Sequence, residues 1–534
     1  MRLDAIGLEV MSQAFASIAE EMGLVLVHSA LSPNIRERRD ASAALFDADG
    51  EMIAQAAHIP VHLGALADAV AAVRRLDPLP GELFLLNDPY SGGSHLPDLT
   101  LIGAIEIDEA IGGYSVVRAH HSDVGGMTAG SMPAGARELY QEGLVIPPTR
   151  LTPDLERLLL ANVRTPTMRR GDLADQRAAV ERGAIGLRAL TRRHGWDALR
   201  AAARDLLDYA ERRTKAALSR LPSAMMNAVD YLEGDGVVDD DLEIRVAVTI
   251  RDGIFRADFT GTRDAAPGNV NCPIAVTRSA VLFVVRTLLP DDVPMNGGVP
   301  RAIEVTAPPG CLVNARPPSA VAAGNVETSQ RIADTVFRAL ASGGCVVPAQ
   351  GQGTMNNVTF GGVGSREPGA GGGSWTYYET IGGGQGASRG AHGPSGVHVG
   401  MSNTLNTPIE VLELEHPLRV RSYALRRGSG GRGTWDGGEG VVREFEALAP
   451  MEMTLLTERR RHGPAGTAGG TDGKSGANLL NGQSLESKAT VRLAGGDVLR
   501  IETPGGGGAG PPADRSPDRQ ADDSRSGKVL RGGR

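Results

Sequence analysis

The sequence predicts a multidomain protein of the α+β class, with mixed helices and strands and a β-rich, glycine-rich C-terminal part. The chain has 534 residues, which is more than a single hydrophobic core usually organises. Hydrophobic residues make up 41% of it and can form large buried cores. Helical periodicity dominates the first part and short strand patterns the second. We therefore expect two regions, residues 1–234 and 235–508.

The N-terminal region is predicted to contain a hairpin and several helices. Asp49-Gly50 is a typical tight turn, and strand-like residues flank it at 43–46 and 52–55. Thr152 and Pro153 stand where an N-cap residue and a first helical residue are expected. Apolar spacing predicts helices over residues 6–22, 65–76, 153–161, 172–193 and 196–218.

A second hairpin is predicted in the same region. Residues 99–107 and 114–119 have the composition of β-strands. The adjacent glycines Gly112 and Gly113 are the expected connection between them. In a hairpin, the residue that enters the first strand lies near the residue that leaves the second.

Three side chains at the open end of this hairpin predict a divalent metal site. His95 and Asp98 precede or begin the first strand, and His120 ends the second. The hairpin should therefore bring the three together. Imidazole and carboxylate groups are ligands of zinc, manganese and iron. The alternative is a pair of polar loops whose histidines are only hydrogen-bonded.

The C-terminal region is predicted to be rich in strands and glycine. Asp252-Gly253 marks a further hairpin, and residues 342–400 are dominated by glycine. Helices are expected over 277–289 and 328–341. From residue 509 to 534 the chain is polar and proline-containing, so we expect a disordered tail. Further strands are expected over residues 441–446, 453–458, 489–493 and 498–502.

Bulk properties exclude several classes of function. The net charge of −8, with both signs interspersed, argues against nucleic-acid binding. The N terminus lacks a signal-peptide pattern, and no run of 18 apolar residues predicts a membrane span. Three cysteines without a CxxC pair suggest no disulfide framework. A soluble, cytoplasmic enzyme is the expectation.

Dispersed motifs carry a resemblance to a known family. The chain resembles the hydantoinase B/oxoprolinase family, which includes B-type components of ATP-dependent N-methylhydantoinases, the C-terminal half of 5-oxoprolinases, and metal-bearing subunits of acetone and acetophenone carboxylases. The matching segments include SPNIRERRDASAALFDADGEMIAQAAHIPVHLGAL, GELFLLNDPYSGGSHLPDLTLI, AHHSDVGGMTAGSMP, ELYQEGLVIPP, PMNGGVPRAIEV, GNVETSQR and YYETIGGGQGA.

This resemblance implies a metal-assisted hydrolase that opens a hydantoin or 5-oxoproline ring. The ligand positions of the carboxylase relatives fall on His95, Asp98 and His120. Asp123 and His121 lie in a neighbouring family motif and are the side chains expected to move a proton.

Other matched residues are candidates for substrate binding or for support of the site. For each, a structural histidine, a helix cap or a solvated ion pair is the alternative. For the Gly324–Arg331 segment, one interpretation is a plain N-cap by Thr328 or Ser329. The alternative is a polar, substrate-facing helix start that suits an anionic carboxylate or phosphate. The candidates are Asp88, His58, His62, Glu142, Glu327 and Arg331.

ATP binding is expected on a partner. The glycine-rich IGGGQGASRGAHG lacks the GxxxxGK[ST] pattern of a P-loop, and no GxSxG nucleophile is present. A hydantoinase A-type subunit should therefore bind ATP, activate the small cyclic amide and form a hetero-oligomer with this chain. A ketone carboxylase subunit is the runner-up, and a non-catalytic scaffold that stabilises the partner is a third possibility.

Overall fold

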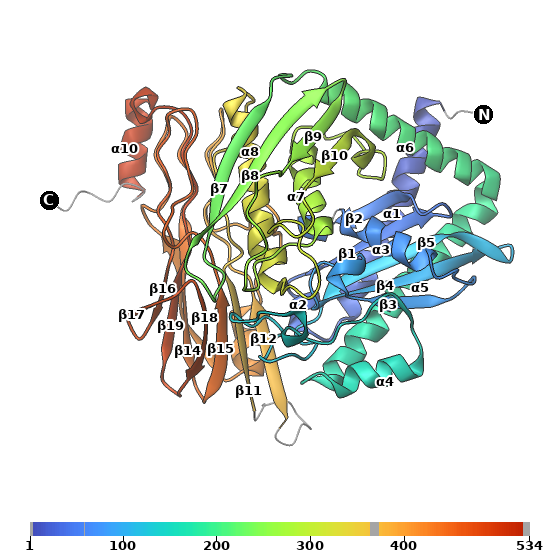
Figure 1. The fold of residues 1–534 in the computed structure, drawn as a ribbon, viewed down its shortest axis with the longest axis horizontal. Coiled ribbons are helices and arrows are strands. Elements are labelled where there is room, and N and C mark those ends of the chain that lie inside the picture. The colour runs from blue at the N-terminus through green and yellow to red at the C-terminus, as the bar shows by residue number, and fades with distance from the viewer. Residues whose placement is uncertain (1–3, 58, 63, 364–372, 527–534) are drawn as a thin grey trace.

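The computed structural model describes residues 4–57, 59–62, 64–363 and 373–526. It has three parts that follow one another along the chain (Figure 1). An N-terminal six-stranded sheet carries helices, a central four-stranded sheet carries two more, and two C-terminal sheets pack together. The predicted mixed, multidomain fold class is confirmed.

The N-terminal sheet has the strand order β2-β1-β5-β4-β3-β6. Helices α1 and α5 pack against one set of its strands, and α3 packs against β4 and β5. Short helices α2 (Pro33–Arg36), η1 (Pro60–His62), η2 (Pro89–Ser91) and η3 (Leu139–Gln141) lie in the connections. The other elements are α1 (Ala5–Ser29), β1 (Ala41–Asp47), β2 (Met52–Ala57), α3 (Ala65–Arg74), β3 (Leu83–Leu86), β4 (Asp98–Ile107), β5 (Ala110–His120), β6 (Thr149–Arg150), α4 (Pro153–Ala161), α5 (Pro166–His194) and α6 (Trp196–Leu218).

Helix α1 forms part of the N-terminal core. Its Phe15, Met22 and Leu26 side chains are buried, and the helix contacts α5, β1 and β2. Its Ile6–Ser29 span is also long and apolar enough to cross a membrane by length and composition, and 44% of its most apolar window is buried. This packing is that of a core helix.

The turn of the second hairpin lies earlier than predicted. Strands β4 and β5 are joined at Asp108-Glu109, which both have positive φ, 50° and 62°. That conformation is the one a two-residue hairpin turn requires. Gly112 and Gly113 lie inside β5 instead. A Cβ at Gly113 would come within 2.4 Å of the Phe46 carbonyl oxygen. Close approach to the Phe46 backbone explains Gly113, and close approach to the Ile107 side chain, 2.4 Å from a Cβ, explains Gly112.

The central sheet has the order β10-β9-β8-β7 and is covered by α7 and α8. The predicted boundary at residue 234 falls between β7 and β8, which pair with each other, so this unit begins near Met226. The cysteines Cys272 and Cys311 are buried here and free. The elements are β7 (Met226–Glu233), β8 (Asp241–Arg251), β9 (Ile254–Asp258), α7 (Ile274–Thr287), η4 (Pro300–Ala302), β10 (Ile303–Thr306), the π-helical turn η5 (Gly324–Thr328) and α8 (Ser329–Ser342).

Two C-terminal sheets form a sandwich, in the orders β12-β11-β15-β18 and β13-β14-β19-β16-β17. Their facing side chains share one core, in which the rings of Phe360 and Phe445 lie 5.3 Å apart. The elements are β11 (Asn357–Val363), β12 (Ser374–Glu379), α9 (Ile409–Glu415), β13 (Leu418–Arg426), β14 (Gly440–Ala447), β15 (Met451–Leu456), β16 (Ala477–Leu480), β17 (Gln483–Leu485), β18 (Lys488–Leu493) and β19 (Val498–Glu502).

The glycine-rich loops of this part pack backbone against backbone. A Cβ at Gly506 would come within 2.0 Å of the Gln385 carbonyl oxygen, and one at Gly384 within 2.1 Å of the Gly438 carbonyl oxygen. Side chains are therefore excluded at these crossings. The glycine-rich run at 505–508 is buried and ordered by backbone hydrogen bonds to neighbouring loops.

The predicted disorder of residues 509–534 is wrong for the described part, which extends to residue 526. There η6 (Pro512–Asp514) and α10 (Pro517–Arg525) lie beside the C-terminal sheets (Figure 1). Arg515 pairs with Asp523 at 2.7 Å and with Asp436 at 3.1 Å. The polar composition predicted disorder because it offers little apolar surface to pack. Buried ion pairs, and not apolar contacts, hold this segment in place.

Candidate metal centre

The second hairpin positions two of the three predicted ligands. Asp98 is the first residue of β4 and His120 the last of β5, and the two are direct partners in the strand register. His95 lies in the preceding loop, where its carbonyl accepts a hydrogen bond from the Asp98 backbone N–H at 3.1 Å. The local fold thus brings the three side chains to one end of the sheet.

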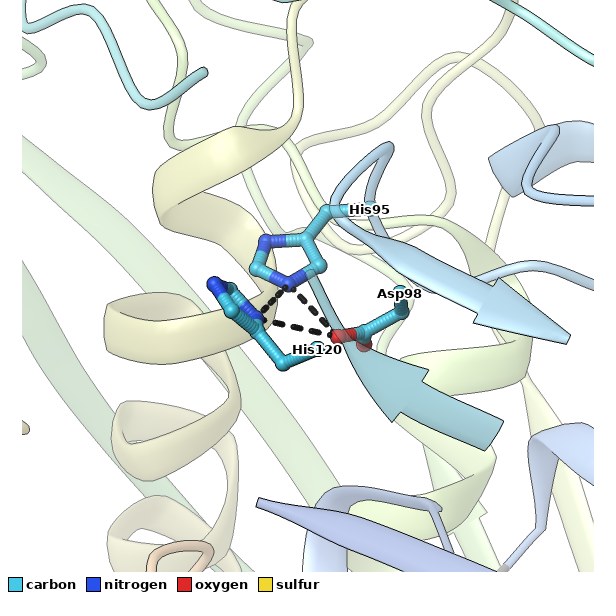
Figure 2. A group of neighbouring side chains, drawn as sticks. All are labelled: His95, Asp98 and His120. Atoms are coloured by element: carbon cyan, nitrogen blue, oxygen red, sulfur yellow. Dashed lines mark hydrogen bonds and ion pairs between the residues drawn. The ribbon is translucent and has the colours of Figure 1, made fainter. Parts of the chain in front are cut away.

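Figure 2 shows how closely the three side chains converge. His95 Nε2 lies 3.0 Å from Asp98 Oδ1, and His120 Nδ1 lies 3.1 Å from the same oxygen. The two imidazole nitrogens are 3.2 Å apart. All three residues are buried. The three atoms form a nearly equilateral triangle, hereafter the triad (His95, Asp98 and His120).

The triangle fits the donor set of a divalent cation. Ligand atoms about 2.1 Å from a metal, at right angles to one another, are separated by about 3.0 Å. The donors, two imidazoles and one carboxylate, match the facial set of transition-metal sites. The residues present therefore fit a metal.

Neighbouring groups hold the triad in place. His95 Nδ1 lies 3.3 Å from the Ala322 carbonyl oxygen, a contact that leaves Nε2 for the triad. Ser94 Oγ donates to Asp98 Oδ2, and Asn325 donates to the same oxygen at 3.4 Å. Asn325 lies in the π-helical turn η5, a distortion common at functional sites.

Electrostatics keep the triad carboxylate ionised. Burial raises the pKa of Asp98, but the charge of His95 and hydrogen bonds from His120, His62 and His95 outweigh it and hold the pKa well below its usual range. Burial lowers the pKa of His95, yet the Asp98 carboxylate raises it overall. For His120, burial dominates and the pKa is lowered. The ionised Asp98 carboxylate is the negatively charged ligand that a cation requires.

His62 also joins this site. Its Nε2 lies 3.4 Å from Asp98 Oδ2, and its Nδ1 lies 3.0 Å from Ser42 Oγ. The other histidine of this segment, His58, lies outside the described residues. Pro60, whose position between the two histidines argues against a shared helix face, begins the short helix η1.

A small cavity of about 20 Å³ adjoins the triad. That volume holds about one water molecule. Since pockets for whole ligands measure about 300–1,000 Å³, a cyclic amide needs this cavity to widen. A cavity of about 520 Å³ between the β1–β2 turn, α3 and α7 contains none of the triad. The small cavity is lined by Asp40, Ile59, Val61, His62, Asp98, His120, Asn325, Val326, Met355, Tyr378, Thr380, Ser402 and Thr404.

Asp40 is a site residue that the sequence analysis missed. Its side chain lines the cavity, is 7% exposed and makes no hydrogen bond or ion pair in the described part of the chain. Its charge raises the pKa of both His95 and His120, although burial is the larger influence on each. The signal that could have identified Asp40 was its place in the segment RRDASAAL, which is part of the family resemblance. Tyr378, stacked 4.6 Å from His120, was also missed.

The two predicted proton-transfer residues have other contacts. His121 Nε2 lies 2.9 Å from Gln176 Oε1, and burial together with Arg169 lowers the pKa of His121 to about 4. Asp123 pairs with Arg164 at 2.9 Å and accepts hydrogen bonds from loop backbone N–H groups. These contacts give both residues a structural role, and neither is assigned the proton transfer proposed for this site.

Two further predicted residues shape backbone near the site. Asp88 caps η2, accepting from Tyr90 N at 3.0 Å. Glu142 accepts from Val321 N at 2.9 Å and from Ala322 N at 2.8 Å, at the start of the helical segment that leads into η5 and α8. Glu142 therefore caps the segment whose Ala322 carbonyl contacts His95. The predicted cap by Thr328 is wrong, because Thr328 is itself helical and donates to the Val270 carbonyl.

Glu327 and Arg331 belong to a buried polar network behind the cavity. Glu327 accepts from Asn357 Nδ2 at 2.7 Å and from Met355 N at 3.1 Å. Arg331 pairs with Glu458 at 3.2 Å and with Asp230 at 3.5 Å. Neither side chain lines the cavity. Their contacts are those of structural residues.

Two named proteins are similar to this chain over nearly its whole length. 5-oxoprolinase 1 of Arabidopsis thaliana is 35% identical, and the alignment covers 95% of this chain and 42% of that protein. The chain thus spans about two fifths of such relatives. The B-type component of a putative D-/L-hydantoinase of Pseudomonas sp. is 30% identical, with 99% of this chain and 94% of that protein covered.

Solved structures share the whole fold. The ATP-dependent caprolactamase from Pseudomonas jessenii has a TM-score of 0.90 at 27% identity, covering 99% of this chain and 94% of that one. Acetone carboxylase, with a TM-score of 0.87 at 18% identity over 98% and 78% of the two chains, shows the same fold. The model of the hydantoinase B/oxoprolinase family matches residues 4–512. This chain belongs to the hydantoinase B/oxoprolinase family.

Proposed function

We propose that this chain is the metal-bearing subunit of an ATP-dependent hydrolase that opens a cyclic amide, a hydantoin or 5-oxoproline. The convergence of two imidazole nitrogens and one carboxylate oxygen within 3.2 Å of one another supports it most directly. The likeness over nearly the full length of a hydantoinase B-type component favours a hydrolase over the ketone carboxylase alternative. A scaffold without chemistry would have no need of this buried triad.

In this proposal the triad holds a divalent cation such as zinc, manganese or iron. When bound, the cation supplies Lewis acidity, which polarises a substrate oxygen or lowers the pKa of water. The chain contributes the arrangement around it. Asp98 joins the two histidines, and Ala322 and Asn325 orient His95 and the carboxylate.

Asp40 is the proton acceptor that we propose. It faces a cavity with room for about one water molecule and has no competing partner among the described residues. A carboxylate there can take a proton from that water as the water attacks the activated amide carbon. His62 stays hydrogen-bonded to Asp98 and keeps its carboxylate in place.

ATP chemistry is assigned to a partner, a hydantoinase A-type subunit that activates the amide and forms a cytoplasmic hetero-oligomer with this chain. The hydantoinase relative is named as one subunit of its enzyme, which supports a partnership. Reconstitution tests this directly: the purified chain, an A-type subunit, ATP and hydantoin or 5-oxoproline are mixed, and ring-opened product is measured. We expect turnover only with both subunits, and none with His120→Ala. Turnover by the isolated chain, or undiminished turnover by the variant, contradicts the proposal.

A further inference from the structure

We infer that the cavity beside the triad contains a subsite for an oxyanion of the substrate, formed by a hydroxyl wall (Thr380, Ser402 and Thr404) with Arg38 behind it. The inference rests on the proposed function and narrows its substrate: the species that enters carries a carboxylate or a phosphoryl group. These two groups share the chemistry that the wall recognises, a negatively charged oxygen.

Arg38 is a fully buried cation without a carboxylate partner. Its guanidinium donates to Asn34 Oδ1 at 3.1 Å, to the Tyr378 carbonyl at 2.7 Å, to Thr404 Oγ1 at 3.2 Å and, more closely, to Thr380 Oγ1. All four acceptors are neutral. Its Nε has no partner, and the guanidinium forms no ion pair within the described ranges. A buried charge left in this state is costly unless a ligand balances it.

The charges around the cavity leave room for an anion. Asp40 and Asp98 are the carboxylates that line it, and together they balance one divalent cation held by the triad. The positive charge of Arg38 then remains unbalanced. Arg38 also lies 5.1 Å from the centre of the Tyr378 ring, which stacks on His120, so its charge is close to the triad. The metal-loaded site therefore favours one negative charge.

The hydroxyl wall has a hydrogen-bond donor to offer. Ser402 Oγ lies 2.7 Å from His398 Nδ1, His398 Nε2 lies 3.2 Å from Thr404 Oγ1, and Thr404 Oγ1 lies 2.7 Å from Thr380 Oγ1. This is an open row of four groups joined by three hydrogen bonds.

A neutral His398 has one N–H, and each hydroxyl has one proton, so the row holds one donor more than it uses. Burial, and then the charge of Arg38, lower the pKa of His398 to about 3, which keeps it neutral. A protonated ring would add a further donor, so the result holds in either state. Whichever way the row is oriented, the spare proton is on a hydroxyl of Thr380, Ser402 or Thr404, and all three line the cavity.

Arg38 strengthens that donor. Because its Nη2 donates to the oxygens of both Thr380 and Thr404, it polarises their O–H bonds toward other acceptors. A cation that aligns hydroxyl donors at a buried cavity is the arrangement that stabilises an oxyanion. The present cavity of about 20 Å³ admits one oxygen atom, so it must widen to hold the oxyanion against the wall together with the attacking water beside Asp40.

Anion binding to the zinc-loaded chain, measured by titration calorimetry, tests the subsite. The probes are inorganic phosphate and 5-oxoproline, and the variant is the double substitution Thr380→Val and Thr404→Val, which removes hydroxyls and keeps shape. Thr376→Val is the control, since Thr376 lies on β12, which Thr380 directly follows, is buried and has an unpartnered hydroxyl away from the cavity. We expect the double variant to bind the anion about tenfold or more weakly, as for loss of a hydrogen bond to a charged group. Thr376→Val should match the wild type.

The outcomes distinguish a phosphoryl group from a carboxylate, and they test the subsite separately from the proposed function. Binding of phosphate assigns the subsite to a phosphoryl group, and binding of 5-oxoproline alone assigns it to a carboxylate. A zinc-loaded wild type that binds neither probe, or a double variant that binds as tightly as wild type, overturns the subsite. Zinc content is measured on every sample, because failure of the wild type to bind zinc contradicts the proposed function itself.

Discussion

At the scale of single residues, the two adjacent histidines at the end of β5 show what decides a role. Successive side chains of a strand point to opposite faces of a sheet. His120 meets Asp98 and the cavity, whereas His121 meets Gln176 of α5. The sequence suggested a site role for each, His120 as a metal ligand and His121 in proton transfer, and only His120 contacts the triad. The same logic could have removed His121 from the predicted proton-transfer residues.

Glu327 provides a prediction at this scale. Burial, and then the charge of Glu458, raise its pKa from an ordinary 4.5 to about 8. Folding therefore favours its protonated form, and this stabilisation is full below pH of about 4.5 and is lost as pH rises toward 8. We expect the free energy of unfolding of the wild type to fall between pH 6 and 8.5 relative to Glu327→Gln, measured by urea denaturation.

Glu410→Gln, on the exposed surface of α9, is the control and should follow the wild type at both pH values. If Glu327→Gln loses as much stability as the wild type between the two pH values, the buried carboxyl is not the group that titrates.

At the scale of elements, local patterns predicted most helices and strands. Helix α6 and helix α4 occupy the predicted ranges, and Thr152 caps α4 through the Leu155 N–H at 3.2 Å. The misplaced features depend on distant contacts. Glu142 caps a segment that lies 179 residues later in the chain. The glycines of β5 are explained by close contacts with neighbouring strands. No local periodicity carries such information, which is why the predicted hairpin turn was wrong and the cap by Glu142 was not predicted.

Helix α10 gives the prediction for this scale. Asp523 is buried; it pairs with Arg515 of the same segment at 2.7 Å and with Arg432 of the C-terminal part at 3.0 Å. Asp523→Ala should release residues 511–526, which limited proteolysis will detect as faster cleavage. Because the opening is local, Tm should fall by no more than about 2–4 °C. Asp518→Ala, on the exposed side of α10, is the control, and equal cleavage of the two variants would show that the ion pairs do not hold the helix.

At the scale of the whole molecule, the cavity exists only because three parts meet. The N-terminal sheet supplies the triad and Asp40, the central part supplies Asn325, and the C-terminal part supplies Tyr378 and the hydroxyl wall. The sequence predicted the triad because its members lie within one hairpin. It could not predict the wall, since residues about 260 to 310 positions later in the chain reach the triad only through the packing of separate sheets.

A buried ion network joins the central and C-terminal parts. Glu458 is fully buried and binds Lys488 at 2.6 Å and Arg331 at 3.2 Å. Glu458→Gln leaves two buried cations short of a partner, so we expect a loss of about 3–5 kcal/mol in the free energy of unfolding. Glu446→Gln breaks a largely exposed pair with Arg419 and should cost no more than about 1 kcal/mol. Similar losses in the two variants, measured by urea denaturation, would mean that the network does not couple these parts.

The central claim is that the triad holds a divalent metal, and elemental analysis of three purified chains tests it most directly. We expect about one metal per wild-type chain, about one in His121→Ala, and loss of the metal in His120→Ala. The neighbouring histidine is the matched control, because it is equally buried but contacts Gln176. Circular dichroism confirms that all three chains are folded. Metal retained in His120→Ala at the wild-type level, or absent from the wild type after purification with added zinc, manganese and iron, contradicts the claim.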